Sequence, residues 1–191
     1  MPRPPMLPIP DREAIFNQGI TYAEWLANPD TQSHGDKIKN FYNASIFTTE
    51  VQAALSKIET PVKIIAIAET WCGDVIRHAP LLVKMCEATQ GMAEIRFISR
   101  EDAPEFFIRF LTNGGESLPK FVFCSAEFTE VGNWGPMSET PRSYISEGKA
   151  VGDVRAAREK VSAFYKENGA HESTAELLQL IQRTGLAVLP Q

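Results

Sequence analysis

One of the three cysteines in this chain stands where an apolar, strand-like run meets a helix-like segment. Cys72 lies in the sequence Trp71-Cys72-Gly73-Asp74-Val75, and the apolar run before it covers residues 62–67. At such a junction the free amides and the dipole of a helix N-terminus stabilise a thiolate, which is the nucleophilic form of cysteine. We therefore expect the pKa of Cys72 to be lowered and Cys72 to be a catalytic nucleophile.

The elements that must position Cys72 alternate between strand and helix along the chain. The first two strands are joined by a helix, so we expect them to lie parallel with a right-handed connection. The whole order predicts an α/β fold with a mixed sheet flanked by helices. Strands are expected at 62–68, 94–100, 121–123 and 128–134, and helices at 72–90, 104–111 and 153–167, with a last helix announced by the capping-box sequence Ser173-Thr174-Ala175-Glu176.

The first sixty residues predict an added helical region. Residues 1–10 are rich in proline and indicate an extended tail, whereas residues 11–58 have a helical pattern that Pro61 ends. The sequences Thr21-Tyr22-Ala23-Glu24 and Thr49-Glu50-Val51-Gln52 have the spacing of capping boxes. We predict a helical extension at 1–60, a central domain at 61–168, and a C-terminal helix and tail at 169–191.

Several landmarks together resemble the thioredoxin superfamily over roughly residues 60–168. Trp71 stands directly before Cys72, and Pro80 lies eight residues after it, where members of that superfamily kink their active-site helix. Leu118-Pro119 precedes the third predicted strand. The stretch 111–119 resembles a bacterial branch of the superfamily that carries extra N-terminal helices. The resemblance implies a thioredoxin-like fold with helices added at the N- and C-termini.

The resemblance also implies a substrate-binding surface around the cysteine. It implies that the Leu118-Pro119 peptide bond is cis and that its loop lies against Cys72. Substrate contacts are then expected from Trp71, Gly73, Asp74, Val75, Leu118 and Pro119. The chain departs from the superfamily pattern at two positions: Val75 replaces the second cysteine, and Ala66 stands where a buried aspartate helps proton transfer.

No other cysteine of the chain is placed to replace the missing thiol. Cys86 is 14 residues beyond Cys72, which is about 21 Å along a straight helix. Cys124 is five residues beyond Pro119, or about 16 Å along an extended strand. Because a disulfide tolerates a Cα separation of only about 7 Å, we expect any resolving thiol to come from outside the chain.

Three interpretations of Cys72 remain open on the sequence. It acts as a monothiol in disulfide exchange, with glutathione, another small thiol or a second protein as resolver. It forms mixed disulfides as a redox sensor or covalent binder. Or it is a relic in a non-catalytic module that binds a protein or peptide in a groove formed by Trp71, Pro119 and the N-terminal helices. We favour the first, a single-cysteine thiol–disulfide oxidoreductase, with the binding module as the alternative.

Two further alternatives are less favoured. Peroxiredoxins carry a threonine three residues before their reactive cysteine, and Glu69 occupies that position here. Val75 would also fit a change introduced to trap mixed disulfides, although serine or alanine is the usual choice. Glu69 is expected on the surface, and Asp74 as a solvated first-turn carboxylate, with a role as local proton acceptor as the alternative.

Other polar and aromatic residues have structural explanations. Cys86 and Cys124 are expected in the core, and Trp134 as packing at a strand end. His78 lies six residues after Cys72, roughly 240° around the helix, so we expect it to face away from the thiol, at the surface. No histidine–cysteine spacing matches a zinc site, so we expect no metal and no cofactor.

The composition of the chain limits the classes of molecule that it is expected to bind. The 191 residues carry a net charge of −5 and a pI of about 5.3, and 43% of them are hydrophobic. The hydrophobic content predicts a folded core. The negative net charge gives no indication of a basic surface for nucleic acid or a membrane. No apolar stretch is long enough to span a bilayer and no signal sequence is visible, so a cytoplasmic location is expected. The oligomeric state is not indicated.

Overall fold

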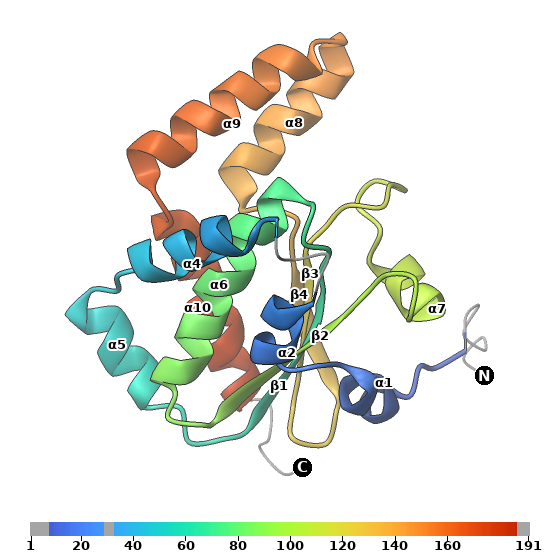
Figure 1. Cartoon of the computed structure of the whole chain (residues 1–191), viewed down its shortest axis with the longest axis vertical. Helices are drawn as coiled ribbons and strands as arrows, with labels where there is room; N and C mark the ends of the chain where they lie inside the picture. Colours follow the sequence, from blue (N-terminus) through green and yellow to red (C-terminus); the bar gives the residue numbers. More distant parts are fainter. Residues whose placement is uncertain (1–7, 29–32, 187–191) are drawn as a thin grey trace.

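The centre of the fold is a four-stranded mixed sheet. The structure is a computed structural model that describes residues 8–28 and 33–186. The strand order is β2-β1-β3-β4 (Figure 1). β1 (Val62–Ile67) pairs in parallel with β2 (Ala93–Ile98) and antiparallel with β3 (Lys120–Cys124), which pairs antiparallel with β4 (Glu130–Trp134). The mixed sheet expected from the sequence is confirmed.

Helices cover both faces of this sheet. α6 (Gly73–Ala88) connects β1 to β2 and contacts α10 (His171–Leu186), which packs on β1, β3 and β4. α7 (Pro104–Phe107) continues into a 3₁₀ turn at Ile108–Phe110 and lies on the other side of the strands (Figure 1). β3 is therefore enclosed, and all five of its residues are buried. This explains the continuous apolar sequence of its residues 121–124.

Four described helices precede the sheet in the chain. They are α1 (Arg12–Gln18), α2 (Tyr22–Ala27), α4 (Gly35–Ala44) and α5 (Thr49–Ser56). α1 and α2 contact the β1–β2 edge, whereas α4 and α5 pack on α6. The predicted capping box at Thr21 is present, but α5 is capped by Thr48, whose side chain accepts a hydrogen bond from the Val51 amide. The capping box predicted at Thr49 was thus wrong, because the N-cap is Thr48 and the residue three positions later is Val51, which cannot complete a box.

The N-terminal region is attached to the edge of the sheet by both backbone and aromatic contacts. Ile20 and Phe97 exchange two backbone hydrogen bonds of 2.8 Å, which extends the sheet beyond β2. The rings of Trp25 and Phe97 stack with centroids 4.7 Å apart, and Tyr22 lies 5.8 Å from Phe97. These helices therefore cover an edge strand that would otherwise expose unpaired backbone groups.

The C-terminal third contains three helices, whereas the sequence predicted two. α8 (Glu139–Val151) was not predicted, because Pro141 and Gly148 lie within it. The signals that mark it are Ser138 at its N-terminus and Gly152 after its end, where φ is 75°. α9 (Val154–Asn168) agrees with the predicted helix. α10 begins at His171, so the capping box predicted at Ser173 was wrong, since Ser173 and Thr174 are buried inside the helix.

α8 and α9 form a hairpin that projects from the rest of the fold (Figure 1). α10, expected as part of a C-terminal addition, instead packs directly on three strands. The domain limits at residues 60 and 168 stay a prediction.

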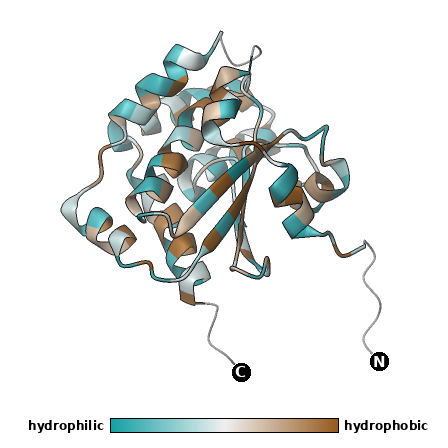
Figure 2. Cartoon of the chain, turned by 60° about the horizontal axis from the view of Figure 1, so that its bottom comes forward, coloured by the Kyte–Doolittle hydropathy of each residue, from teal (hydrophilic) through white to brown (hydrophobic). Residues whose placement is uncertain are grey.

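Hydrophobic residues concentrate on the strands and on the helix sides facing them, and the outer helix turns are largely hydrophilic (Figure 2). Among the described residues, no helix combines the length and apolar character needed to cross a membrane.

Two leucines of α10 provide a matched test of the packing of this helix on the sheet. Leu177 is fully buried, whereas Leu186 in the last turn is 71% exposed. We predict that Leu177→Ala lowers the free energy of unfolding by about 2–5 kcal/mol, because it leaves a cavity beneath the helix. Leu186→Ala should change it by less than about 0.5 kcal/mol. Urea denaturation followed by circular dichroism measures both; equal effects would contradict the packing of α10 on the sheet.

Candidate functional site around Cys72

Cys72 lies where the first turn of α6 meets the loop before β3. It is the N-cap residue of α6 and is partly buried. Its Sγ donates a hydrogen bond to the carbonyl oxygen of Leu118, 3.5 Å away. The Leu118–Pro119 peptide bond is cis. The sulfur is thus held between a helix N-terminus and a backbone carbonyl.

The electrostatic environment of Cys72 differs from the sequence prediction. Burial raises the pKa of the Cys72 thiol above its ordinary value, and the negative charge of Asp74 raises it further. The backbone amides of Val75 and Asp74 act in the opposite direction, as expected for a helix N-terminus, but they are outweighed. The expected lowering of the pKa was therefore wrong. The sequence indicates that the thiol lies at the amides of a helix N-terminus, but it does not indicate how far the thiol is buried.

Asp74 is not the solvated carboxylate that its first-turn position suggested. Burial raises its pKa to about 6, although the positive charges of Arg77 and Arg158 favour the ionised form. Near neutral pH it is therefore mostly ionised and adds negative charge beside Cys72. Its role as a proton acceptor, the alternative considered above, stays a prediction.

The hairpin of α8 and α9 forms one wall of a groove that contains Cys72. The groove has a volume of about 640 Å³. Its opposite wall is formed by Trp71 and Cys72 and by the first turns of α6, through Gly73, Asp74 and Arg77. Its floor comes from residues 116–118 and from Pro136 and Met137. The wall from the hairpin consists of Ile145, Lys149, Val154, Arg158, Val161, Ser162 and Tyr165. An incoming group can thus reach the sulfur between α6 and the hairpin.

The base of the hairpin is joined to α6 through Tyr165. The guanidinium of Arg77 lies between the rings of Tyr165 and Phe41, 4.3 and 4.8 Å from their centroids. The hydroxyl of Tyr165 is 3.0 Å from Nε2 of His78. His78 is fully buried, and burial lowers its pKa to about 3, so it is neutral. The prediction that His78 lies at the surface was wrong.

A buried lysine connects the loops beneath the groove. Lys120, only 4% exposed, donates hydrogen bonds of 2.7 Å to Oγ1 of Thr112 and to the carbonyl oxygen of Gly135. Burial lowers the pKa of Lys120 to about 8. Gly135 has φ of 124°, and a Cβ added there would lie 2.0 Å from the carbonyl oxygen of Pro119. The Gly135–Pro136 peptide bond is also cis. The two proline-containing loops are therefore in direct contact.

The residues expected at the site separate into two groups. Trp71, Gly73, Asp74 and Leu118 line the groove with Cys72, and Trp71 is 60% exposed. Val75 is fully buried and Pro119 is buried too, so neither faces the groove. Neither residue lines the groove, and substrate contact by these two stays a prediction.

The remaining cysteines and Trp134 lie in the core, as expected. Cys86 and Cys124 are buried, and burial raises the pKa of Cys124 to about 11. Trp134 stacks on Phe121 with centroids 5.7 Å apart, and its Nε1 donates a hydrogen bond to Glu176. Cys72 is thus the one cysteine that is open to an incoming reactant.

A second hollow, of about 680 Å³, lies on the other side of Trp71. The N-terminal region contributes to this hollow through Trp25, Ser33 and His34, whereas none of its residues lines the Cys72 groove. The expected groove between Trp71, Pro119 and the N-terminal helices is therefore not the one that contains the thiol. Glu69 borders this second hollow and is only partly exposed, because its carboxylate accepts a hydrogen bond from the Arg100 amide.

The family membership of this chain follows from its sequence as a whole. A family model described as thioredoxin matches residues 19–149. The chain belongs to the thioredoxin family. The match begins within the N-terminal helices and extends into α8, so it includes Cys72 and the loop at Leu118. Among curated proteins, no match was found.

Solved structures share the thioredoxin-like fold at low sequence identity. A protein of unknown function from Pseudomonas aeruginosa superposes with a TM-score of 0.69 and 14% identity, covering 91% of this chain and 98% of its own. An HIV epitope-scaffold superposes with a TM-score of 0.67 and 16% identity, covering 89% of this chain and 96% of its own. Both likenesses cover most of the chain, and they concern the fold alone.

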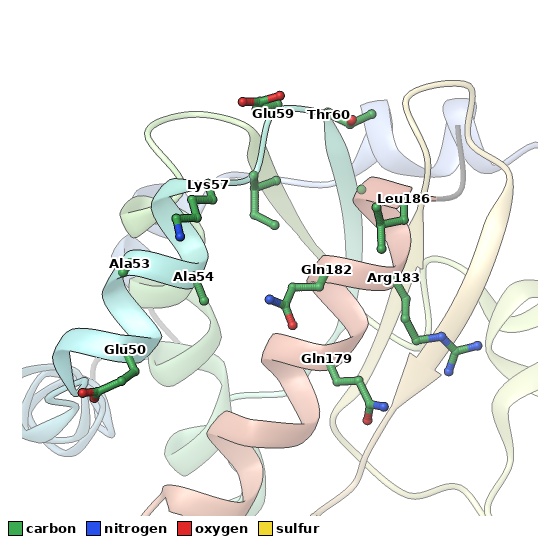
Figure 3. A pocket seen from close by; sticks show the side chains of 12 residues that line it. Glu50, Ala53, Ala54, Lys57, Glu59, Thr60, Gln179, Gln182, Arg183 and Leu186 are labelled. Atoms are coloured by element: carbon green, nitrogen blue, oxygen red, sulfur yellow. The ribbon is translucent and has the colours of Figure 1, made fainter. Parts of the chain in front are cut away.

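A further hollow in this thioredoxin-family chain lies between α5 and α10, away from Cys72. Figure 3 shows the side chains that line it, among them Glu50 on α5 and Gln182 on α10. It has a volume of about 800 Å³ and no cysteine or histidine in its lining. Within residues 8–28 and 33–186, no cluster of three or more potential metal ligands occurs. The groove at Cys72 is therefore the candidate site.

Sequence reasoning missed the groove residues on the hairpin. Val154, Arg158, Val161 and Tyr165 repeat at helical spacing, which indicates one face of α9. Nothing in the spacing says what that face lies against. Only the placement of the hairpin beside α6 shows that this face of α9 lines the groove. This placement depends on the contacts of Tyr165 with Arg77 and His78.

The charge of Asp74 gives a direct test of the Cys72 environment. We predict that Asp74→Asn lowers the pKa of the Cys72 thiol, because it removes a neighbouring negative charge, and increases alkylation at pH 7.5 by about two- to fivefold. In the wild type the alkylation rate should keep rising with pH above the range of an ordinary thiol. The measurement is the rate of iodoacetamide labelling against pH, with each cysteine quantified by mass spectrometry.

Glu116→Gln is the matched control for Asp74→Asn. Glu116 also lines the groove, but its carboxylate is paired with Arg100 at 2.7 Å. Its removal should leave the labelling profile of Cys72 unchanged. An Asp74→Asn profile that shifts to higher pH, or equal shifts in both variants, would contradict the assigned role of Asp74.

The contact of Gly135 with Pro119 predicts a large loss of stability on substitution. Gly135→Ala combines an unfavourable positive φ with a clash against the Pro119 carbonyl, so we expect a loss of more than about 2 kcal/mol. Gly114 also has a positive φ, but its Cβ position is open. Gly114→Ala should therefore cost only about 1 kcal/mol. Thermal unfolding compares the two, and the reverse order would exclude the close approach of the loops.

Proposed function

We propose that this protein is a thiol–disulfide oxidoreductase that acts through Cys72 alone and needs an external resolving thiol. The observation that carries the proposal is the exposure of one thiol in an open groove, while Cys86 and Cys124 are buried. The contact of its Sγ with the Leu118 carbonyl places the reactive group against a backbone segment with which a bound chain could pair. Membership of the thioredoxin family agrees with this chemistry.

The proposed exchange proceeds in balanced steps. The thiolate of Cys72 attacks one sulfur of a substrate disulfide; a new disulfide forms, and the second substrate sulfur leaves as a thiolate with the electron pair of the broken bond. An external thiolate then attacks the sulfur of Cys72 and releases the reduced substrate. A second external thiolate frees Cys72, so two external thiols are oxidised to one disulfide for each substrate disulfide reduced.

The external thiol is required by the positions of the other side chains. Val75, three residues after Cys72, offers no thiol, and the two remaining cysteines lie in the core. Glutathione, another small thiol or a second protein can each supply the resolver. The partner is accordingly a protein or low-molecular-weight thiol or disulfide, with no metal or other cofactor in the proposed steps.

One observation favours a second candidate function, a non-catalytic module that recruits a protein or peptide. Burial, with the charge of Asp74, raises the pKa of Cys72 above its ordinary value and so reduces the share of the reactive thiolate. If catalysis were absent, the groove between α6 and the hairpin would still present a binding surface. The two candidates differ in whether the sulfur of Cys72 is needed.

Substitution of Val75 tests the single-cysteine mechanism. With a peptide disulfide as substrate, the reduced wild type should accumulate a mixed disulfide at Cys72 until a small thiol is added. Val75→Cys should abolish this accumulation, because residues three apart in a helical turn have Cα atoms about 5 Å apart, within the range that a disulfide spans, and can resolve the adduct internally. Intact-mass spectrometry under non-reducing conditions measures the adduct.

Cysteine variants supply the controls. Cys72→Ala should form no adduct, whereas Cys86→Ala and Cys124→Ala should behave as the wild type. Adducts at Cys86 or Cys124, or none at Cys72 after prolonged incubation, would overturn the proposed function. A Cys72→Ala protein that still retains a cellular partner would favour the binding module.

A further inference from the structure

The hairpin offers a continuous face to the groove. On α9 this face runs from Val154 to Tyr165 and includes Arg158 and Val161, and α8 adds Ile145 and Lys149. Val154, Val161 and Ile145 are partly exposed, so their apolar surfaces remain open to a ligand. The hairpin approaches α6 at its base, through Tyr165. The face above that base is therefore free to contact something else.

The length of this face fits an extended polypeptide. From Val154 to Tyr165 it extends about 16 Å along α9, at 1.5 Å per residue. An extended chain covers about 3.3 Å per residue, so about five residues would fill it. A tripeptide such as glutathione would cover only about 10 Å on the same measure. The groove is thus larger than a small thiol requires.

The charges along the groove favour an acidic occupant. Lys149 and Arg158 are exposed, and neither forms an ion pair in the described parts of the chain. The cations in the groove lining, Arg77, Lys149 and Arg158, outnumber its carboxylates, Asp74 and Glu116, and Glu116 is already paired with Arg100. Although the whole chain carries a net charge of −5, the hairpin face is locally cationic.

We propose that the groove binds an extended segment of a second protein, about five residues long, whose reactive cysteine lies at Cys72 and whose acidic and apolar side chains lie along α8 and α9. The inference rests on the proposed function of Cys72 and adds the class of substrate. Carboxylates of the segment meet Lys149 and Arg158, and its apolar side chains cover Val154, Val161 and Ile145. The hairpin is thereby the part of the molecule that selects the substrate.

The test uses capped pentapeptides with a central cysteine linked by a disulfide to 5-thio-2-nitrobenzoate. One peptide is Glu-Leu-Cys-Leu-Glu, the other is Lys-Leu-Cys-Leu-Lys, and glutathione carrying the same group is the small-thiol comparison. Attack by the Cys72 thiolate on the peptide sulfur breaks the disulfide and releases the coloured thiolate. Each rate constant is divided by that measured with 2-mercaptoethanol, which removes intrinsic differences in reactivity.

We expect the acidic peptide to react about tenfold faster than the basic peptide and faster than the glutathione derivative at low salt, with the advantage falling at high salt. The double variant Lys149→Glu/Arg158→Glu should reverse the order of the two peptides. The matched control Lys160→Glu/Lys166→Glu makes the same charge change on exposed positions of α9 outside the groove lining. It should keep the wild-type order.

The outcomes separate this inference from the proposed function. Exchange at Cys72 with no preference between the peptides, a faster reaction of the glutathione derivative, or equal effects of both double variants would overturn the substrate assignment and leave the chemistry intact. Absence of exchange with every probe would overturn the proposed function. In that case, fluorescence anisotropy of a labelled Glu-Leu-Ser-Leu-Glu peptide with Cys72→Ser protein still decides the inference: binding supports it, and no binding rejects it.

Discussion

The contact between the sulfur of Cys72 and the carbonyl of Leu118 is the constraint on which the site depends. It requires the first turn of α6 and the loop before β3 to meet, and Lys120 and Gly135 hold that loop against its neighbour. The same contact partly buries the thiol. Burial then outweighs the helix amides and raises the pKa of Cys72. The geometry that positions the Cys72 sulfur therefore also reduces the share of the thiol that is ionised.

The N-terminal and C-terminal helices support this contact in different ways. α1 and α2 cover the edge of the sheet, while α4 and α5 pack on α6. Arg77 connects these layers, because its guanidinium lies between Phe41 of α4 and Tyr165 of α9. A cation held between two aromatic rings is a favourable contact. The orientation of the hairpin thus depends on α6, the helix that also carries Cys72.

Much of the fold was predictable because local patterns determine it. Apolar runs identified the strands, Gly169 marked the end of α9, and the positions of Cys86, Cys124 and Trp134 followed from the elements that carry them. α8 was missed because Pro141 and Gly148 weaken its helical pattern. The predictions of the environments of Cys72, Asp74 and His78 were wrong for a different reason. Burial comes from contacts between residues far apart in the chain, such as His78 with Tyr165, and sequence spacing does not contain them.

A raised pKa changes what the rest of the site must supply. Each unit of increase lowers the thiolate fraction about tenfold below the pKa, while the greater nucleophilicity of a more basic thiolate returns only about threefold. The chemistry of Cys72 alone is therefore slower than that of a strongly activated thiol. Holding a disulfide next to the sulfur can compensate, because a bound reactant has a high effective concentration. The groove along α9 is the part of this molecule that can provide such binding. The proposed recognition of substrate by the hairpin and the proposed exchange at a single, weakly activated cysteine therefore support each other as parts of one mechanism.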